Sequence, residues 1–154
     1  MILRLSQTQD QKAIQKLIGA LYTEFKTAQN SALFNWPEDQ VSSLFQLYKF
    51  VLLINKANEP LGFICFQELN GNNEIIVLGM SPQHQRQGYM RQLVEYFVEN
   101  LCNDGSRVFL EVHENNKRAR AFYEKLGFKI DGLRKNYYSD GSTALNMSLL
   151  KRSK

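Results

Sequence analysis

Residues 74–112 constrain the fold of this chain more than any other segment. An apolar, strand-like run at 74–80 leads through a short polar loop to apolar residues at helical spacing over 88–101, and a second strand-like run follows at 108–112. A strand, a helix and a strand in this order predict a βαβ unit, in which the helix crosses one face of a sheet. The sheet must then contain a parallel pair of strands.

The residues before this unit predict a different arrangement. After an initial strand, a first amphipathic helix is expected, with apolar residues at helical spacing between Ala13 and Phe25. Strands at 50–55, 61–68 and 74–80 are separated by turns rich in Asn, Gly and Pro. This spacing predicts an antiparallel meander.

A second helix is expected between the first helix and the meander. Pro37 suits its first turn, and Glu38 and Asp39 are favourable there because the start of a helix is electropositive. Trp36 is expected to anchor this start. The apolar stripe of the helix consists of Val41, Leu44, Phe45 and Tyr48.

The segment after the βαβ unit completes the order of elements. A helix over 116–126 closes at Gly127, and strands are expected at 128–133 and 143–150. With the initial strand at 1–5, the order is strand, two helices, three strands, helix, strand, helix and two strands. No repeat or linker interrupts it, so we predict one α/β (α+β) domain over 1–154.

Composition narrows the possible functions. A hydrophobic content of 44% supports a packed core, and a net charge of +4 from scattered basic residues gives little reason to expect a nucleic-acid partner. The apolar runs are strand-sized and the amino terminus has no signal pattern, so we expect a cytoplasmic protein without membrane attachment. Cys65 and Cys102 stand far apart with no metal-binding motif, so no disulfide or metal is predicted.

The loop before the 88–101 helix has the character of an anion cradle. Backbone N–H groups at a helix start lack intrahelical partners, and the helix dipole adds positive potential. Gly88 would let the backbone approach an anion closely, and Gln85 and Arg86 could add hydrogen bonds and charge. The alternative is an ordinary turn glycine beside a solvated arginine.

Two motifs resemble those of the GNAT acetyltransferase superfamily. The first resembles the signature Q/R-x-x-G-x-G/A at every position but the last, and the second matches N-x-x-A-x-x-x-Y-x-x-x-G-F between Asn116 and Phe128. The first motif reads Gln85-Arg86-Gln87-Gly88-Tyr89-Met90. The resemblance is strongest from Glu74 onward. Within the superfamily, 109–112 and 134–138 resemble bacterial enzymes that acetylate the amino-terminal residue of ribosomal proteins.

This resemblance implies a GNAT fold, with a mixed, mostly antiparallel sheet of about seven strands flanked by about four helices. It also implies an acetyl-CoA-dependent N-acetyltransferase in which a primary amine attacks the thioester directly, without a metal. The acceptor is left open between a protein N-terminal amine and a small amine, as is the oligomeric state. The residues that would contact acetyl-CoA are Leu78, Gly79, Met80, Gln85, Arg86, Gln87, Gly88, Tyr89, Met90, Asn116 and Tyr123.

The resemblance also suggests the groups that move protons. Tyr123 corresponds to the acid that protonates the leaving thiolate, although its place in an apolar helical stripe also suits a core tyrosine. Glu111, a carboxylate within an apolar run, is the first candidate for the base, and Glu74 is the second. Both could act through water.

Other residues have two interpretations. Tyr137 and Tyr138 are expected either to line the acceptor site or to cover a sheet edge. Met90 stands where the signature has glycine or alanine, so its side chain either turns into the helix-packing surface or loosens the phosphate site. The second possibility would suit a sensor that binds acetyl-CoA without turnover. His84 and His113 receive no role.

Overall fold

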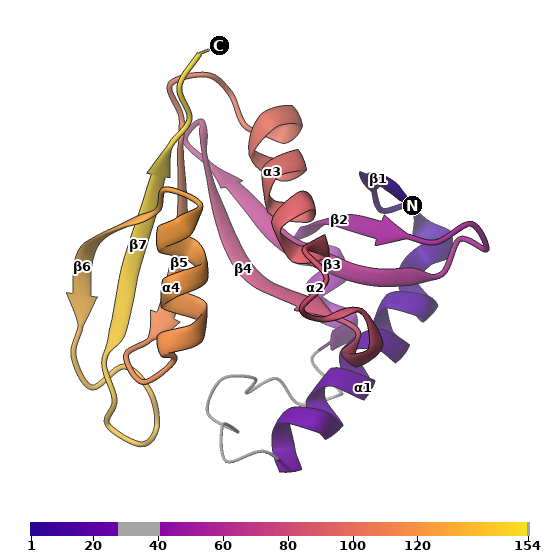
Figure 1. Ribbon diagram of the computed structural model, residues 1–154, viewed down its shortest axis with the longest axis horizontal. Coiled ribbons are helices and arrows are strands. Elements are labelled where there is room, and N and C mark those ends of the chain that lie inside the picture. The colour runs from indigo at the N-terminus through magenta and orange to yellow at the C-terminus, as the bar shows by residue number, and fades with distance from the viewer. Residues whose placement is uncertain (28–40, 154) are drawn as a thin grey trace.

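The computed structural model describes residues 1–27 and 41–153, and they form one seven-stranded sheet with helices on both faces (Figure 1). The elements before the βαβ unit are β1 (Ile2–Leu5), α1 (Gln11–Thr27), α2 (Val41–Leu47), β2 (Lys49–Ile54), β3 (Pro60–Leu69) and β4 (Asn72–Met80). Those that follow are α3 (Tyr89–Leu101), β5 (Arg107–His113), α4 (Lys117–Lys125), β6 (Lys129–Arg134) and β7 (Ala144–Leu150). Short 3-10 turns at Thr8–Asp10 and Pro82–His84 precede α1 and α3.

The strand order is β1-β2-β3-β4-β5-β7-β6. Only β4 and β5 are parallel, and every other neighbouring pair is antiparallel. The predicted sheet and element order are therefore confirmed. The expected helix start around Trp36, Pro37, Glu38 and Asp39 lies outside the described residues.

Each face of the sheet has its own apolar core. On one face, Leu93, Val94 and Phe97 of α3 share a core with apolar residues of β2, β3, β4, β5 and β7, and α4 adds Tyr123. On the other face, the core is made by α1 and α2 against β2 and β3. Figure 1 shows α3 and α4 in front of the sheet and α1 behind it. Each fully buried phenylalanine or leucine stabilises this arrangement by about 1.5–3 kcal/mol.

An ion pair attaches the first helix to the edge of the sheet. Arg4 on β1 donates from its two terminal guanidinium nitrogens to Asp10, at 2.6 and 2.9 Å, and the Gln7 N–H donates to the same carboxylate at 2.7 Å. Asp10 is 7% exposed, and its hydrogen bond with Arg4 lowers the pKa of its carboxyl. The sequence reasoning missed this pair.

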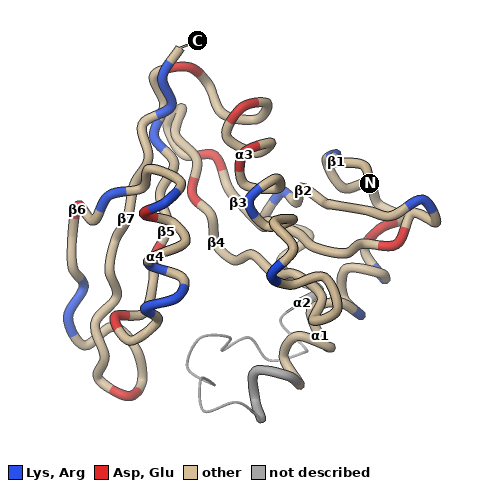
Figure 2. Tube along the Cα trace, in the orientation of Figure 1, with Lys and Arg blue, Asp and Glu red and all other residues tan. Residues whose placement is uncertain are grey.

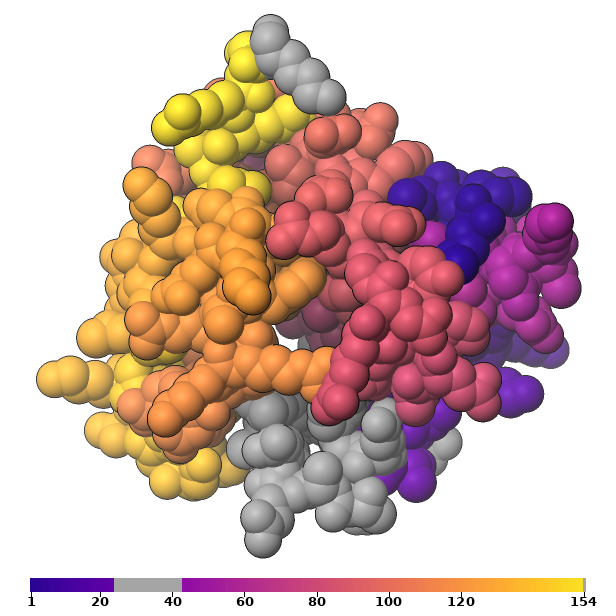
Figure 3. Space-filling model, viewed as in Figure 1, coloured from indigo at the N-terminus to yellow at the C-terminus, as the bar shows by residue number. Residues whose placement is uncertain are grey.

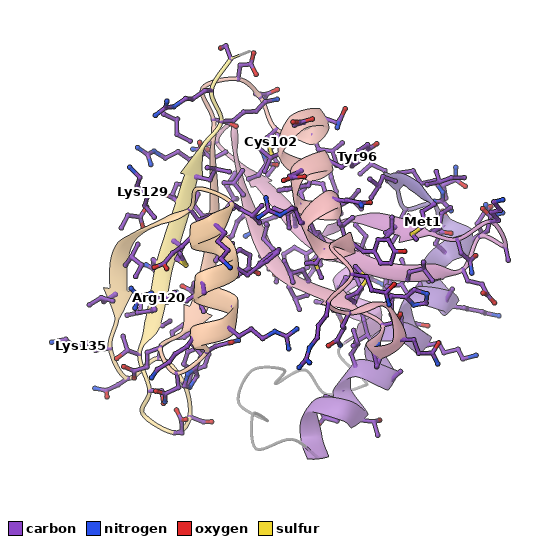
Figure 4. The ribbon with its side chains drawn as sticks, in the orientation of Figure 1. Met1, Tyr96, Cys102, Arg120, Lys129 and Lys135 are labelled. Carbon is purple, nitrogen blue, oxygen red and sulfur yellow. The ribbon has the colours of Figure 1, made fainter. Side chains whose placement is uncertain are left out.

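The other edge of the sheet is solvated. Strand β6 is exposed over nearly its whole length, and Lys129 and Lys135 project outward from this side of the molecule (Figure 4). Charged side chains on an edge strand discourage pairing with another chain.

Candidate active site

Strand β4 is paired very differently along its two edges. Its pairing with β3 runs from Leu69↔Asn72 to Gly62↔Met80, with one register shift where Ile76 is the extra residue. Its pairing with β5 consists of Asn73↔Val108 and Glu74↔Phe109 alone. Beyond these pairs the two strands diverge (Figure 1), and the surface is hollowed between α3 and α4 (Figure 3).

The divergence leaves main-chain groups of β4 without a strand partner. The Ser81 N–H donates to the Leu61 carbonyl at 2.8 Å, and hydrogen-bonded pairs alternate along antiparallel strands. Gly79 therefore directs its N–H toward β3, whereas Leu78 and Met80 direct theirs toward the open side. In agreement, the Met80 carbonyl accepts from Gln85 Nε2 at 3.2 Å rather than from β3.

Gly79 has a packing role. A Cβ at this position would lie 2.5 Å from Leu21 Cδ1 of α1 and 2.9 Å from Phe63 Cε1. The glycine lets α1 approach the sheet. Among the three expected contacts on β4, the geometry favours Leu78 and Met80 as donors to a ligand.

The loop before α3 presents the start of that helix to solvent. Gly88 is the N-cap at φ +82°, and a Cβ there would meet no heavy atom within 4 Å, so the position requires backbone freedom rather than space. Arg86 is also left-handed, at φ +60°. The first intrahelical bond is from Gln92 N–H to Gly88 O, and no side chain caps the helix. The N–H groups of the first turn can therefore bind an outside acceptor.

Met90 faces the protein interior. It is partly buried and packs against the core under α3. Of the two interpretations of this departure from the signature, the packing one agrees with the structure. Its side chain gives no reason to expect a weakened phosphate site.

Unpaired positive charge surrounds the hollow. Arg86 before α3 and Lys117 and Arg118 at the start of α4 form no ion pair among the described residues, and Figure 2 shows basic residues at these places. Arg91 and Arg120 are instead paired along their own helices. Such charge suits a polyanionic ligand.

Tyr123 lies on the face of β5 that carries α3 and α4. It is 7% exposed, meets Phe122 and Phe128 edge-on, and shares a core with Leu110 and Val112. Burial raises the pKa of its hydroxyl well above the ordinary value, so the group is protonated at working pH.

Glu111 lies on the opposite face of β5, because side chains alternate along a strand. Its Oε1 accepts from an Arg134 guanidinium nitrogen at 2.7 Å, and its hydrogen bond with Tyr137 raises the pKa of that phenol. Glu74 Oε2 accepts from Gln67 Nε2 at 2.6 Å. Glu74 and Glu111 both line an open cavity of about 440 Å³, so the structure brings the two candidate bases together.

The hairpin between β6 and β7 is anchored beside this cavity. The Arg134 guanidinium lies 4.3 Å from the Tyr137 ring centroid, and the Tyr138 ring contacts the His113 ring at a tilt of 33°, with centroids 4.6 Å apart. Burial raises the pKa of Tyr138 to about 12. Tyr137 thus contacts Glu111, and Tyr138 reaches this cluster through its edge-on contact with Tyr137.

Asn116 and His113 have structural partners. The Asn116 side chain caps α4 by accepting from the Ala119 N–H at 3.0 Å, so only its amide nitrogen is left for a cofactor. His113 is buried, accepts from the Asn115 N–H through Nδ1, and holds Nε2 3.5 Å from Asp140.

Arg134 is a site residue to which sequence reasoning gave no role. The available signal was weak, because β6 reaches Glu111 only across the intervening β7. An arginine in one strand and a glutamate in another reveal a contact only when the strand order is known.

A sheet opened beside an uncapped helix, with a protonated tyrosine of α4 over one face of β5 and the Glu111 carboxylate on the other face, is an arrangement suited to acyl transfer from a thioester. The model of the acetyltransferase (GNAT) family matches residues 13–128. The chain belongs to this family and is an acetyl-CoA-dependent N-acetyltransferase.

Individual relatives are also named as N-acetyltransferases. The ribosomal protein bS18-alanine N-acetyltransferase of Escherichia coli K12 is 29% identical over 111 residues, covering 71% of this chain and 75% of that protein. The crystal structure of the ribosomal-protein-S18-alanine N-acetyltransferase from Escherichia coli superposes with a TM-score of 0.77 at 26% identity, over 99% of this chain and 96% of that one. An aminoglycoside 6'-N-acetyltransferase complexed with coenzyme A shares the fold, with a TM-score of 0.73 at 17% identity over all of both chains.

Among the residues that the structure describes, no helix is long and apolar enough to cross a membrane.

Proposed function

We propose that this enzyme acetylates the α-amine of a protein N terminus. The relatives named for alanine N-acetylation support this acceptor. The chemistry supports it too, because an α-amine with a pKa near 8 is about one tenth neutral at pH 7, whereas a lysine amine is almost wholly protonated. A modest base is therefore enough.

The observation that carries the mechanism is the placement of Tyr123 and Glu111 on opposite faces of β5, where that strand parts from β4. A thioester lying between the strands would meet an acid on one face and a base on the other. Glu111, through water, accepts the proton of the amine as its nitrogen attacks the carbonyl carbon. The carbon–sulfur bond then breaks, and Tyr123 gives its proton to the sulfur.

We prefer Glu111 to Glu74 as the base because of the point at which the pairing between β4 and β5 ends. Glu74 is itself the last residue of β4 paired with β5, opposite Phe109. Glu111 lies two residues past that pair on β5, where the strands have begun to separate. Glu74 remains the alternative base.

The cofactor would follow the hollow from the loop to the strands. Its pyrophosphate would accept from the first-turn N–H groups of α3 over Gln85–Met90, with Arg86 adding charge. The thioester oxygen would accept from the main chain of β4 at Leu78 or Met80. A sensor without turnover is less well supported. That interpretation depended on a Met90 side chain that loosens the phosphate site, and the side chain packs against the core instead.

The test is a thiol-release assay with acetyl-CoA against peptides that begin with alanine, serine or methionine, alongside small amines. The proposal predicts N-terminally acetylated peptide by mass spectrometry, with small amines turned over far more slowly. Acetylation of small amines without any peptide product would contradict the proposed acceptor.

A further inference from the structure

Asn146 on β7 is the residue directly opposite the proposed base, Glu111 on β5. Along the same two strands, the Glu114 N–H donates to the Thr143 carbonyl at 3.0 Å. Hydrogen-bonded and non-hydrogen-bonded pairs alternate along antiparallel strands, so this bond makes Glu111 and Asn146 a non-hydrogen-bonded pair. Side chains in such a pair lie especially close together and on one face of the sheet. The Asn146 amide therefore lies beside the base, on the face away from the α3/α4 core.

The Asn146 amide has an acceptor without a donor. Its Oδ1 is buried and has no hydrogen-bond partner among the described residues, which is rare for a buried polar atom. On β6, Gly132 pairs with Asn146 directly after a bulge at Asp131, and a Cβ at Gly132 would lie 3.3 Å from Asn146 Nδ2. The amide nitrogen thus faces β6, and the oxygen, on the other branch of the planar amide, is directed away from β6 and toward β5.

The ion pair of Glu111 with Arg134 passes over the strand that carries this oxygen. Strand β7 lies between β5 and β6 (Figure 1), so the 2.7 Å bond from Arg134 to Glu111 Oε1 crosses it. The β7 residues paired with these two are Asn146 and Ala144, and only Asn146 has a polar side chain. An arginine partner stabilises an ionised carboxylate, whereas a base must also accept a proton. A group that stabilises the protonated carboxyl would therefore help the base to act.

We propose that Asn146 is a positioning residue for the base, and that its Oδ1 accepts a hydrogen bond from Glu111 once Glu111 has taken up the proton of the amine. An ionised carboxylate has only acceptor oxygens, whereas a protonated one has an O–H donor. Arg134 can keep its bond to Oε1 while the Oε2–H group donates to Asn146. The buried oxygen then has a donor only when Glu111 is protonated, which favours proton transfer from the amine to the base.

The inference rests on the role of Glu111 as base in the proposed mechanism. The proton leaves the amine nitrogen as that nitrogen bonds to the carbonyl carbon, and it passes through water to Glu111 Oε2. After the product leaves, Glu111 returns a proton to water, and Tyr123 regains from water the proton that it gave to the thiolate. Asn146 neither gains nor loses a proton and acts only through Glu111.

Other ionisable groups surround Glu111, so a pH effect has to be separated from theirs. They come from β6, the hairpin, β4 and β5 itself, and they are Arg134, Asp131, Tyr137, Tyr138, Glu74 and His113. A double-mutant cycle between Asn146 and Glu111 leaves all of them unchanged. Its coupling therefore belongs to that pair alone.

The test combines Asn146→Leu with Glu111→Gln and measures kcat/KM by thiol release. It uses the best acceptor found in the peptide and amine screen, at the pKa of its amine and about 1.5 pH units below. Leucine has nearly the size of asparagine but no amide, so Asn146→Leu should lower kcat/KM about fivefold at the lower pH, the effect of one lost hydrogen bond, and less than about twofold at the higher pH. In the Glu111→Gln background, the same substitution should leave the pH dependence unchanged.

Asn73→Leu is the matched control. Asn73 Oδ1 is also buried and without a partner among the described residues, but Asn73 lies beside Val108 on the α3/α4 face. Its ratio of kcat/KM at the two pH values should equal that of the wild type. Each ratio is taken within one variant, so a loss of folded protein cancels.

An unchanged ratio in Asn146→Leu, or an equal change in the presence and absence of Glu111→Gln, would overturn the inference while leaving the proposed base intact. If Glu111→Gln alone leaves the ratio unchanged, the proposed base is wrong and the inference fails with it. The single Glu111 variant thus distinguishes the two failures.

Discussion

On its β3 side, β4 is paired from Asn72 to Met80, whereas on its β5 side the pairing ends at Glu74. The glycines at the paired edge and at the open end also have different surroundings. Gly79 lies where a Cβ would collide with Leu21, whereas Gly88, at the open end, has empty space and a left-handed backbone. The paired edge is built by close packing and the open edge by unpartnered main-chain donors, which need water or a ligand. Stability and cofactor binding should therefore respond to different residues.

Loss of the Tyr123 hydroxyl should give the largest effect at the open edge. Tyr123→Phe keeps the ring and its contacts with Phe122 and Phe128, so kcat should fall about a hundredfold or more while CoA affinity is nearly unchanged. Because burial raises the pKa of this phenol, kcat should show no basic limb from it below about pH 10. A fall of less than threefold in steady-state kcat would dismiss Tyr123 as the acid.

A carboxylate at the helix start should weaken cofactor binding next most strongly. Gly88→Asp places negative charge against the phosphates, so the Kd for CoA measured by calorimetry should rise about thirtyfold, or ~2 kcal/mol. Gly105→Asp is the matched control, since Gly105 is also left-handed with empty space around it. Equal affinities in the two variants would show that the phosphates bind elsewhere.

Removing the base should give a smaller, pH-dependent loss. Glu111→Gln should lower kcat/KM about tenfold near pH 6.5, where an α-amine is mostly protonated, and less than threefold near pH 8. Arg134→Gln breaks the same 2.7 Å ion pair while keeping the carboxylate, so it should not reproduce this profile. If Glu74→Gln shows the pH-dependent loss instead, the two glutamates exchange roles.

Met90 should affect folding far more than binding. Met90→Ala removes a side chain that packs against the core, so unfolding in urea should show a loss of about 2 kcal/mol or somewhat less for a half-buried site. CoA affinity should change less than twofold. A marked gain in affinity would mean that the side chain intrudes on the phosphate site.

The sequence predicted the open edge in outline. Residues 85–90 and Tyr123 lie within local motifs, where strand, loop and helix follow each other directly, so their surroundings could be expected. The ion pair of Glu111 with Arg134 and the bulge at Asp131 depend on the order β5-β7-β6. The order of strands in the sheet brings together residues that are far apart in the sequence, so no local sequence pattern reveals these contacts. Likewise, the direction of Met90 depends on the packing of α3 against the sheet.

Amide hydrogen exchange of single residues in β4, followed by NMR with and without CoA, tests the comparison most directly. Leu78 and Met80 should exchange quickly in the free protein and become protected when CoA is bound, since their N–H groups face the open edge. Gly79 and Ser81 should be protected in both states, because theirs face β3. Protection of Leu78 and Met80 without CoA, or no change when it binds, would contradict an edge held open for the cofactor.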